Sequence, residues 1–297
     1  MTTSTPTVVL VHGAFADASS FARVIPELLA DGLEVLAPAV PNRSLLGDAA
    51  YIASIVRRIP GPVVLVGHSY GGAVITVAGV EDNVQALVYL AGYALEEGES
   101  LGELQGGFPD SDLAPALVFS PFPVEGSDEP GTDVTVDIDK FPAIFAADVD
   151  PGLARTLAVS QRPLAGAGRP PGGPPPAGGG QPPTGPGGAP RRHNNTHPPH
   201  LPAAAGPPPP PPPPAAPPRP GPAAAPPPPP PAAAWRTKPS WGLVSSADRT
   251  INPDVERFGY QRAGMTTVEV DSAHLVMLAH PKEVADLIRE AVRSTGA

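Results

Sequence analysis

Short apolar runs alternate with segments of helical periodicity from residue 7 to residue 90, and again towards the end of the chain. The runs are rich in valine and leucine, and each is bounded by glycine, proline or a polar turn residue. Such runs are typical of strands buried on both faces, so the alternation predicts a parallel sheet with helices on both sides. The expected strands are 7–12, 34–37, 62–66, 84–90, 241–245 and 266–270, and the expected helices are 21–30, 48–59, 71–80, 253–262 and 281–292.

The alternation stops near Ala94 and resumes at Trp241. Between them no run before residue 164 has the character of a core strand, and only 141–145 and 151–159 have the character of short helices. We therefore expect an α/β core interrupted by an insertion that includes a helical cap over the active site. The expected domains are a core of 1–94 and 235–297, a cap of 95–164 and an insertion of 165–234.

The insertion has an unusual composition. About two-thirds of the 47 prolines lie between residues 163 and 231, and residues 165–234 contain no Val, Ile, Phe or Met. Such a segment buries too little apolar surface to offset the entropy of ordering, so it is expected to be extended or disordered. A ligand for a domain that binds proline-rich peptides is one alternative. Another, which we favour, is a sequence error, because a shifted frame in GC-rich DNA encodes mainly Pro, Ala, Gly, Arg and His.

Charge and composition exclude several kinds of partner. The net charge is -10, which argues against nucleic acid or an anionic membrane as the main partner. The absence of cysteine excludes disulfides, a thiolate nucleophile and a cysteine-based zinc site. Residues 1–6 lack the features of a secretory signal, and no run approaches the roughly 18 apolar residues of a membrane span. We expect a cytoplasmic location.

The pentapeptide 67–71 reads Gly-His-Ser-Tyr-Gly and joins an expected strand to an expected helix. G-x-S-x-G in this context is typical of a nucleophile elbow, a tight turn that presents a serine hydroxyl at the top of a sheet. Glycines are needed on both sides because the turn leaves no room for side chains, and Gly72 lets the helix pack close to the strand. Ser69 is the candidate nucleophile. The alternative is a glycine-rich turn that holds a phosphate or nothing.

Asp248 and His274 are the candidate partners of Ser69. A serine hydroxyl is a weak nucleophile at neutral pH, so it needs a base, and the base needs an orienting acid. With this elbow the chain order is Ser, then Asp or Glu, then His. Asp248 and His274 follow in that order, each just after an expected strand. Alternatives for the acid are Asp254, which is expected to open a helix, and Asp271, which is close to His274 along the chain.

The loop after the first strand reads His12-Gly13-Ala14-Phe15. An oxyanion needs two backbone N–H donors, for which Tyr70, next to the nucleophile, and Ala14 are the candidates. Gly13 allows the backbone to turn. We expect His12 to pin this loop rather than to act as a second base, and Phe15 to contact substrate.

His193, His197 and His200 have a spacing that occurs at metal sites. They lie in the proline-rich tract, where no ordered scaffold is expected, so we predict no metal. The chain also lacks a glycine-rich dinucleotide fingerprint, and no cofactor is expected.

Together these motifs resemble the α/β-hydrolase superfamily, and most closely the small bacterial esterases related to plant methylesterases and hydroxynitrile lyases. The resemblance covers residues 7–163 and 235–292, and its motifs are the loop 12–14, the elbow 67–72, Asp248 and the segment 270–274, Val-Asp-Ser-Ala-His. It implies the α/β-hydrolase fold and no cofactor. The site residues that it implies are a triad of Ser69, Asp248 and His274 and an oxyanion hole at Ala14 and Tyr70.

Two positions separate the lyases of that branch from the esterases. The lyases carry a threonine after the first-strand histidine and a lysine after the catalytic histidine, where this chain has Gly13 and Leu275. The resemblance therefore implies hydrolysis of a small carboxylic ester. We expect a monomer or homodimer. A lyase-like reaction and a non-catalytic hydrolase-fold binding protein are the alternatives.

Overall fold

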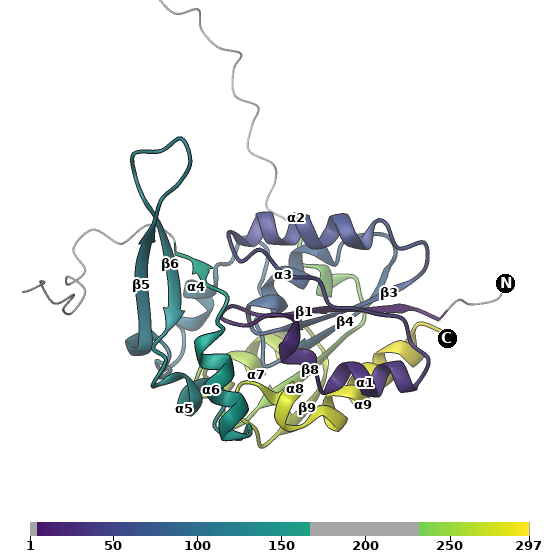
Figure 1. Cartoon of the computed structure of the whole chain (residues 1–297). Helices are drawn as coiled ribbons and strands as arrows, with labels where there is room; N and C mark the ends of the chain where they lie inside the picture. Colours follow the sequence, from purple (N-terminus) through teal and green to yellow (C-terminus); the bar gives the residue numbers. More distant parts are fainter. Residues whose placement is uncertain (1–4, 167–231, 297) are drawn as a thin grey trace, which may run out of the picture. The chain divides into compact units, whose positions relative to one another are not determined.

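The structure is a computed structural model that describes residues 5–166 and 232–296 (Figure 1). The predictions for residues 167–231, including those for His193, His197 and His200, fall outside the described residues. At the edges of this gap, Leu164–Ala165 form strand β7 and Ala234–Arg236 form a 3-10 helix. Composition assigned Ala165 and Ala234 to the insertion, and in the structure they belong to these two elements.

A six-stranded parallel sheet forms the core, in the order β2-β1-β3-β4-β8-β9. All six predicted strands are present, with small shifts at their ends. β1 and β3 are buried at every residue, as their uninterrupted apolar sequences require. The strands are β1 (Thr7–Val11), β2 (Val35–Leu36), β3 (Val63–His68), β4 (Val84–Leu90), β8 (Ser240–Ser245) and β9 (Thr266–Val270).

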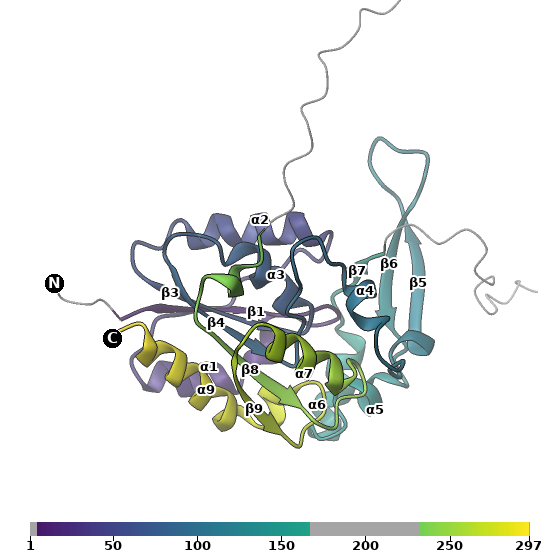
Figure 2. The same cartoon turned by 180° about the vertical axis from the view of Figure 1, so that it is seen from behind.

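Helices cover both faces of this sheet. Figure 1 shows α1 (Val24–Ala30) and α9 (Pro281–Ser294) on one side, and α2 (Leu45–Val56) and α3 (Tyr70–Ala78) on the other. Helix α7 (Pro253–Arg262) packs beside β8 (Figure 2). The short helix α8 (Val276–Ala279) precedes α9. The prediction of helices on both faces is confirmed.

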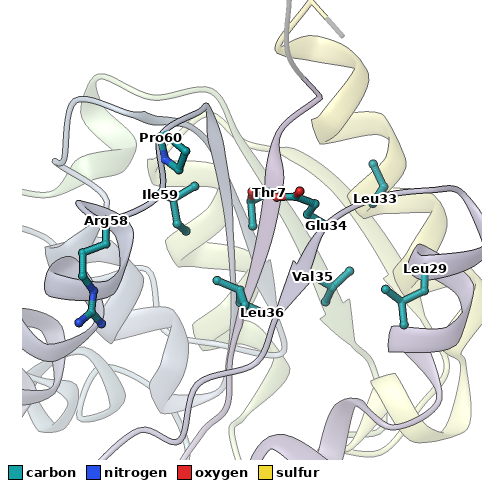
Figure 3. Close-up of a pocket in the computed structure, with 9 residues that line it drawn as sticks. All are labelled: Thr7, Leu29, Leu33, Glu34, Val35, Leu36, Arg58, Ile59 and Pro60. Atoms are coloured by element: carbon teal, nitrogen blue, oxygen red, sulfur yellow. Dashed lines mark hydrogen bonds between the residues drawn. The ribbon is translucent and has the colours of Figure 1, made fainter.

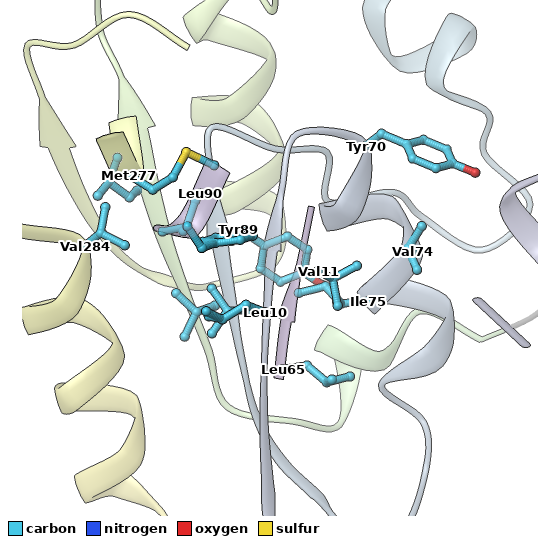
Figure 4. Packing of buried hydrophobic residues seen from close by; sticks show 14 of the residues in the cluster. Leu10, Val11, Leu65, Tyr70, Val74, Ile75, Tyr89, Leu90, Met277 and Val284 are labelled. Atoms are coloured by element: carbon cyan, nitrogen blue, oxygen red, sulfur yellow. The ribbon is translucent and has the colours of Figure 1, made fainter. Parts of the chain in front are cut away.

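Adjacent residues of each strand contribute to opposite halves of the core. Leu10 points towards Val284 of α9, whereas Val11 points towards Ile75 of α3 (Figure 4). All four side chains are fully buried. This alternation fixes the strand register, because a shift by one residue would exchange the two faces.

The residues between β4 and β8 form more than the helical cap that was predicted. In the part that we call the cap segment, residues 95–166, three strands form a separate antiparallel sheet in the order β5-β6-β7. These strands are β5 (Leu117–Phe122), β6 (Gly131–Val136) and β7. The helices are α4 (Leu101–Gln105), α5 (Phe141–Phe145) and α6 (Pro151–Val159), the last two as predicted.

The cap sheet was missed because its sequence lacks the signal of a core strand. β5 contains Pro121, which has no N–H and is tolerated because β5 is an edge strand. β6 alternates buried Val134 and Val136 with half-exposed polar residues, a weak and short pattern. In the described ranges, no helix has the length and apolar character needed to cross a membrane.

Candidate active site

Ser69 occupies a strained turn between β3 and α3. Its backbone has φ 56° and ψ -123°, in the positive-φ region that residues with a side chain rarely adopt. A Cβ at Gly67 would overlap the carbonyl of Gly71, and a Cβ at Gly71 would overlap the carbonyl of Val11. The elbow predicted from the sequence is therefore present, and Ser69 lies at the first turn of α3 with 5% of its surface exposed.

Asp248 and His274 meet at the carboxyl ends of β8 and β9. The Nδ1 atom of His274 lies 2.6 Å from Oδ2 of Asp248, and neither side chain is exposed to solvent. Oδ1 of Asp248 accepts the backbone N–H groups of Thr250, at 2.6 Å, and Ile251, at 3.1 Å. These donors favour the ionised carboxylate and leave Oδ2 facing the imidazole.

The two alternative acids lie elsewhere. Asp254 forms a surface ion pair with Arg257 at 2.7 Å, and Asp271 is exposed. Of the three carboxylates considered from the sequence, only Asp248 contacts the histidine.

Nε2 of His274 is buried and has no hydrogen-bonding partner among the described residues. Consequently the structure does not form a hydrogen bond between His274 and Ser69. With Nδ1–H directed at Asp248, the lone pair of the imidazole is on Nε2, the atom that a base must present. Nucleophile–base contacts are often long without substrate and tighten in the complex.

The elbow also holds the loop of His274. Nε2–H of His68 donates to the backbone oxygen of His274 at 2.9 Å, and the two rings lie 4.6 Å apart. Burial disfavours the charged ring and lowers the pKa of His68 well below its usual value, with a further contribution from the neighbouring His274. His68 is therefore a neutral donor that joins the serine turn to the histidine loop.

The loop after β1 abuts the elbow. A Cβ at Gly13 would lie 2.7 Å from the Cβ of Ser69, so only glycine allows this approach. The N–H of Phe15 donates to the oxygen of Arg162 at 3.1 Å and is not available to an oxyanion. Among the described residues the N–H groups of Ala14 and Tyr70 have no such acceptor. The two N–H groups predicted to bind the oxyanion therefore make no hydrogen bond to another described residue.

His12 pins this loop, as predicted. Its Nε2 accepts the N–H of Val40 at 2.9 Å, and Nδ1 donates to the oxygen of Gly13 at 2.9 Å. Burial lowers the pKa of His12. Because both ring nitrogens are engaged, His12 has no free atom with which to act as a base.

The side chain of Phe15 joins an aromatic group over the histidine. The Phe15 and Phe145 rings pack edge to face at 5.8 Å, and Phe145 in turn packs against His274 at 4.7 Å. Phe15, for which a contact with substrate is predicted, thus lies in the apolar wall next to His274.

Two acidic residues that the sequence did not single out hold parts of the site. Asp148 of the cap segment accepts Oγ–H of Ser272 at 2.7 Å and N–H of Ala273 at 2.8 Å, directly before His274. Asp48 of α2 accepts the hydroxyl of Tyr70 at 2.8 Å. Neither belongs to a recognisable motif, so no sequence signal could have found them.

A groove of about 490 Å³ lies at the opposite edge of the sheet, near the amino ends of β1 and β2. Ligands of parallel α/β sheets bind at the carboxyl ends of the strands, so this groove is not a candidate active site. Its lining residues are Thr7, Leu29, Leu33, Glu34, Val35, Leu36, Arg58, Ile59 and Pro60 (Figure 3). The described ranges contain no cluster of three acidic or histidine side chains that could hold a metal.

Residues 8–287 match the alpha/beta hydrolase family, and the chain belongs to this family. It is also 37% identical over 109 residues to a carbendazim hydrolyzing esterase of Nocardioides sp. (strain SG-4G). That match covers 31% of this chain and 44% of the relative, so it spans less than half of the relative's length.

Solved structures with the same fold include several esterases. Polyneuridine aldehyde esterase has a TM-score of 0.66 at 14% identity and covers 97% of this chain and 99% of its own. A pyrethroid hydrolase from Sphingobium faniae JZ-2 has a TM-score of 0.61 at 18% identity, covering 98% of each chain. A methylesterase from Arabidopsis has a TM-score of 0.62 at 14% identity, covering 97% and 99%. The predicted superfamily and its methylesterase neighbours are confirmed.

Proposed function

We propose that this protein is a carboxylic ester hydrolase that works through an acyl-enzyme, with Ser69 as nucleophile, His274 as base and Asp248 as orienting acid. The observation that carries the proposal is the buried contact of 2.6 Å between His274 and Asp248 beside a serine elbow. A surface histidine or an Asx turn alone would explain neither the burial of both side chains nor their place at the carboxyl edge of the sheet.

In the first half-reaction, Oγ of Ser69 attacks the ester carbonyl while Nε2 of His274 takes its proton. Asp248 accepts the hydrogen bond from Nδ1–H and stabilises the imidazolium. The bond to the alcohol then breaks, and His274 gives its proton to the leaving oxygen. In the second half-reaction, water attacks the acyl-enzyme by the same proton transfers and releases the acid and Ser69.

The negative charge that develops on the carbonyl oxygen is assigned to the N–H groups of Ala14 and Tyr70. Tyr70 is the first residue of α3, so its N–H and the helix dipole both favour an anion. Support for Ala14 comes from its neighbour, because the N–H of Phe15 is already bonded to Arg162.

A small ester with an apolar part fits this site best. The walls next to His274 are the rings of Phe15 and Phe145, and Ser69 is almost fully covered. The similar proteins with named activities are esterases and a pyrethroid hydrolase. Gly13 and Leu275 stand where the lyases of the branch carry threonine and lysine, which supports hydrolysis over cyanohydrin cleavage.

The direct test is labelling with a serine-directed phosphonate, followed by mass spectrometry and an assay on p-nitrophenyl acetate. We expect one phosphonate adduct on the peptide that contains Ser69, with loss of hydrolysis in proportion to labelling. Ser160→Ala, at an exposed serine of the cap segment, is the matched control and should label as the wild type does. Undiminished labelling of Ser69→Ala would assign the nucleophile elsewhere.

The choice of reaction needs a substrate panel. Esters of increasing acyl length, aryl carbamates and a cyanohydrin should be compared under the same conditions. We expect turnover of small esters and none of the cyanohydrin. A protein that binds these compounds with no turnover of any of them would be a hydrolase-fold binding protein.

A further inference from the structure

Glu256, in the first turn of α7, has no exposed surface although it is an acidic residue. Burying an ionised carboxylate without a cation is strongly unfavourable. Its neighbour Arg257 is directed to the surface, where it pairs with Asp254 and Glu269. The carboxyl group of Glu256 therefore lies in the core without a compensating charge.

Asp248 is the group that Glu256 faces. The two carboxyl groups are within hydrogen-bonding reach of each other. Oε2 of Glu256 accepts the N–H of Ser245 at 3.1 Å, while Oε1 is buried and receives no N–H or hydroxyl donor from the described residues. A hydrogen bond between two carboxyl groups requires that one of them holds a proton.

The hydrogen-bond donors around each carboxyl group decide which of the two holds the proton. Asp248 receives N–H groups from Thr250, Ile251 and His274, all of which stabilise a carboxylate. Glu256 receives only the N–H of Ser245. Burial, followed by the charge of Asp248, raises the pKa of Glu256 well above its usual value. The proton therefore belongs on Glu256.

We propose that Glu256 is an un-ionised carboxylic acid that donates a hydrogen bond to Asp248 and so positions the acid of the triad. This inference rests on the proposed function, in which Asp248 orients His274. Glu256 does not touch substrate and is a positioning residue. It restrains the Asp248 carboxylate without placing a second negative charge beside the base.

The other groups around Glu256 do not take over this role. Tyr93, after β4, and Tyr260, on α7, are buried close to it, and burial raises the pKa of both phenols. The Tyr260 hydroxyl accepts the N–H of Gly92 at 2.9 Å, and it makes no hydrogen bond to Glu256 within the described residues. Glu256 is therefore the group whose ionisation at high pH would place a second negative charge directly beside Asp248.

The first test is the pH profile of kcat/KM for Glu256→Gln, which replaces a neutral acid by a neutral amide of similar size. We expect activity within about 3-fold of wild type near neutral pH, an unchanged acid limb and a weakened alkaline limb. If Glu256 were ionised, the variant would lose a negative charge near His274, and its acid limb would move down by about 1 pH unit or more. That shift would overturn the proposal.

Two further variants distinguish a positioning role of Glu256 from a general loss of structure. Glu125→Gln makes the same chemical change at an exposed site and should match the wild type throughout. Glu256→Ala removes the donor, and we expect kcat to fall about 10- to 100-fold with little change in KM. A folded Glu256→Ala enzyme with wild-type kcat would show that the hydrogen bond positions nothing.

The second test does not depend on catalysis. Infrared difference spectra of wild type and Glu256→Gln at neutral pH should show the carbonyl stretch of one un-ionised acid, absent from the variant and retained in Glu125→Gln. Loss of esterase activity in Ser69→Ala leaves this band untouched, so failure of the proposed function and failure of the Glu256 proposal give different results. Absence of the band from the wild type would overturn the protonated state.

Discussion

The core sheet and the cap sheet differ in how far their strands are buried from water. β1 and β3 are buried at every residue, whereas no residue of β5 is fully buried. The parallel sheet thus provides rigid ends on which Ser69, Asp248 and His274 are placed. The cap sheet is buried on one face at most and has an open edge at β5. We therefore expect the cap to support the candidate site through individual contacts rather than through a rigid sheet.

Several contacts between the two regions involve the loops of the candidate triad. Within the cap segment, the oxygens of Ile144 and Phe145 accept hydrogen bonds from Thr250 and Leu275, next to the acid and the base. Asp148 holds the loop that precedes His274. We therefore expect a division in which the core performs the proposed chemistry and the cap holds the loops.

The largest expected effect comes from the core. Ser69→Ala should lower kcat by about 10⁴-fold or more, because loss of a triad member leaves only binding and the oxyanion hole. The change removes one hydroxyl and should leave Tm nearly unchanged. Ester hydrolysis and thermal melting measured together check both parts. Near-wild-type turnover would show that Ser69 is not the nucleophile, and the proposed division between core and cap would then be wrong.

A smaller effect is expected from the cap. Asp148→Ala leaves the hydroxyl of Ser272 and the N–H of Ala273 without their acceptor, at a cost of about 1–3 kcal/mol in unfolding free energy. We expect kcat to fall by about 10- to 100-fold because the histidine loop loses its restraint. Urea unfolding and kcat should be compared with Asp128→Ala, an exposed residue between β5 and β6. If kcat does not fall, the cap has no part in holding the loop.

The pH dependence of stability should come from the core, since the cap segment has no histidine. Burial lowers the pKa of His12 and His68, so their contribution is complete above about pH 6.5, the ordinary histidine value. Below it the unfolded chain binds protons that the folded protein does not, and each histidine lowers stability by up to about 1.4 kcal/mol per pH unit. Urea unfolding over a pH series measures this slope, and His68→Gln should reduce it. An equal slope in that variant would contradict the assignment.

The smallest effect is expected for removal of residues 167–231. All six core strands and all three candidate triad residues lie in the described ranges, so a linker of about ten residues between Gly166 and Ala232 should preserve esterase activity. The cost of loop closure varies slowly with length, and shortening should stabilise the protein by about 1–2 kcal/mol at most. Thermal melting and an ester-hydrolysis assay of the shortened and the full-length protein, measured together, test this. A shortened protein that fails to fold would assign a structural role to the removed residues.

Local patterns determined what could be predicted. The core strands were found because residues such as those of β3 are apolar without interruption, and the elbow because glycines flank Ser69 between a strand and a helix. The pairing of Asp248 with His274 followed from chain order, and the structure brings the two together. Their catalytic roles stay predictions.

What was missed depends on contacts between distant segments. Asp148 and Ser272 are separated by 124 positions along the chain. Glu256 occurs in a helix whose other charged residues are exposed or half-buried, and nothing in its neighbours marks it as buried. The cap sheet was missed because Pro121 and a half-polar β6 gave no strand signal. These features are visible only when the three-dimensional neighbours are known.

The hydrogen bond from His68 to the backbone of His274 has a consequence for protein engineering. One pentapeptide carries the candidate nucleophile and also anchors the loop of the candidate base, so moving Ser69 with its glycines into another scaffold would transfer only one of these two functions. In a saturation library at position 68, the tolerated substitutions should be side chains that supply an N–H at similar reach. Larger apolar side chains at this position should give inactive enzymes, even though His68 is not expected to contact the ester. Directed evolution of new substrate ranges should therefore target the wall formed by Phe15 and Phe145 rather than the elbow.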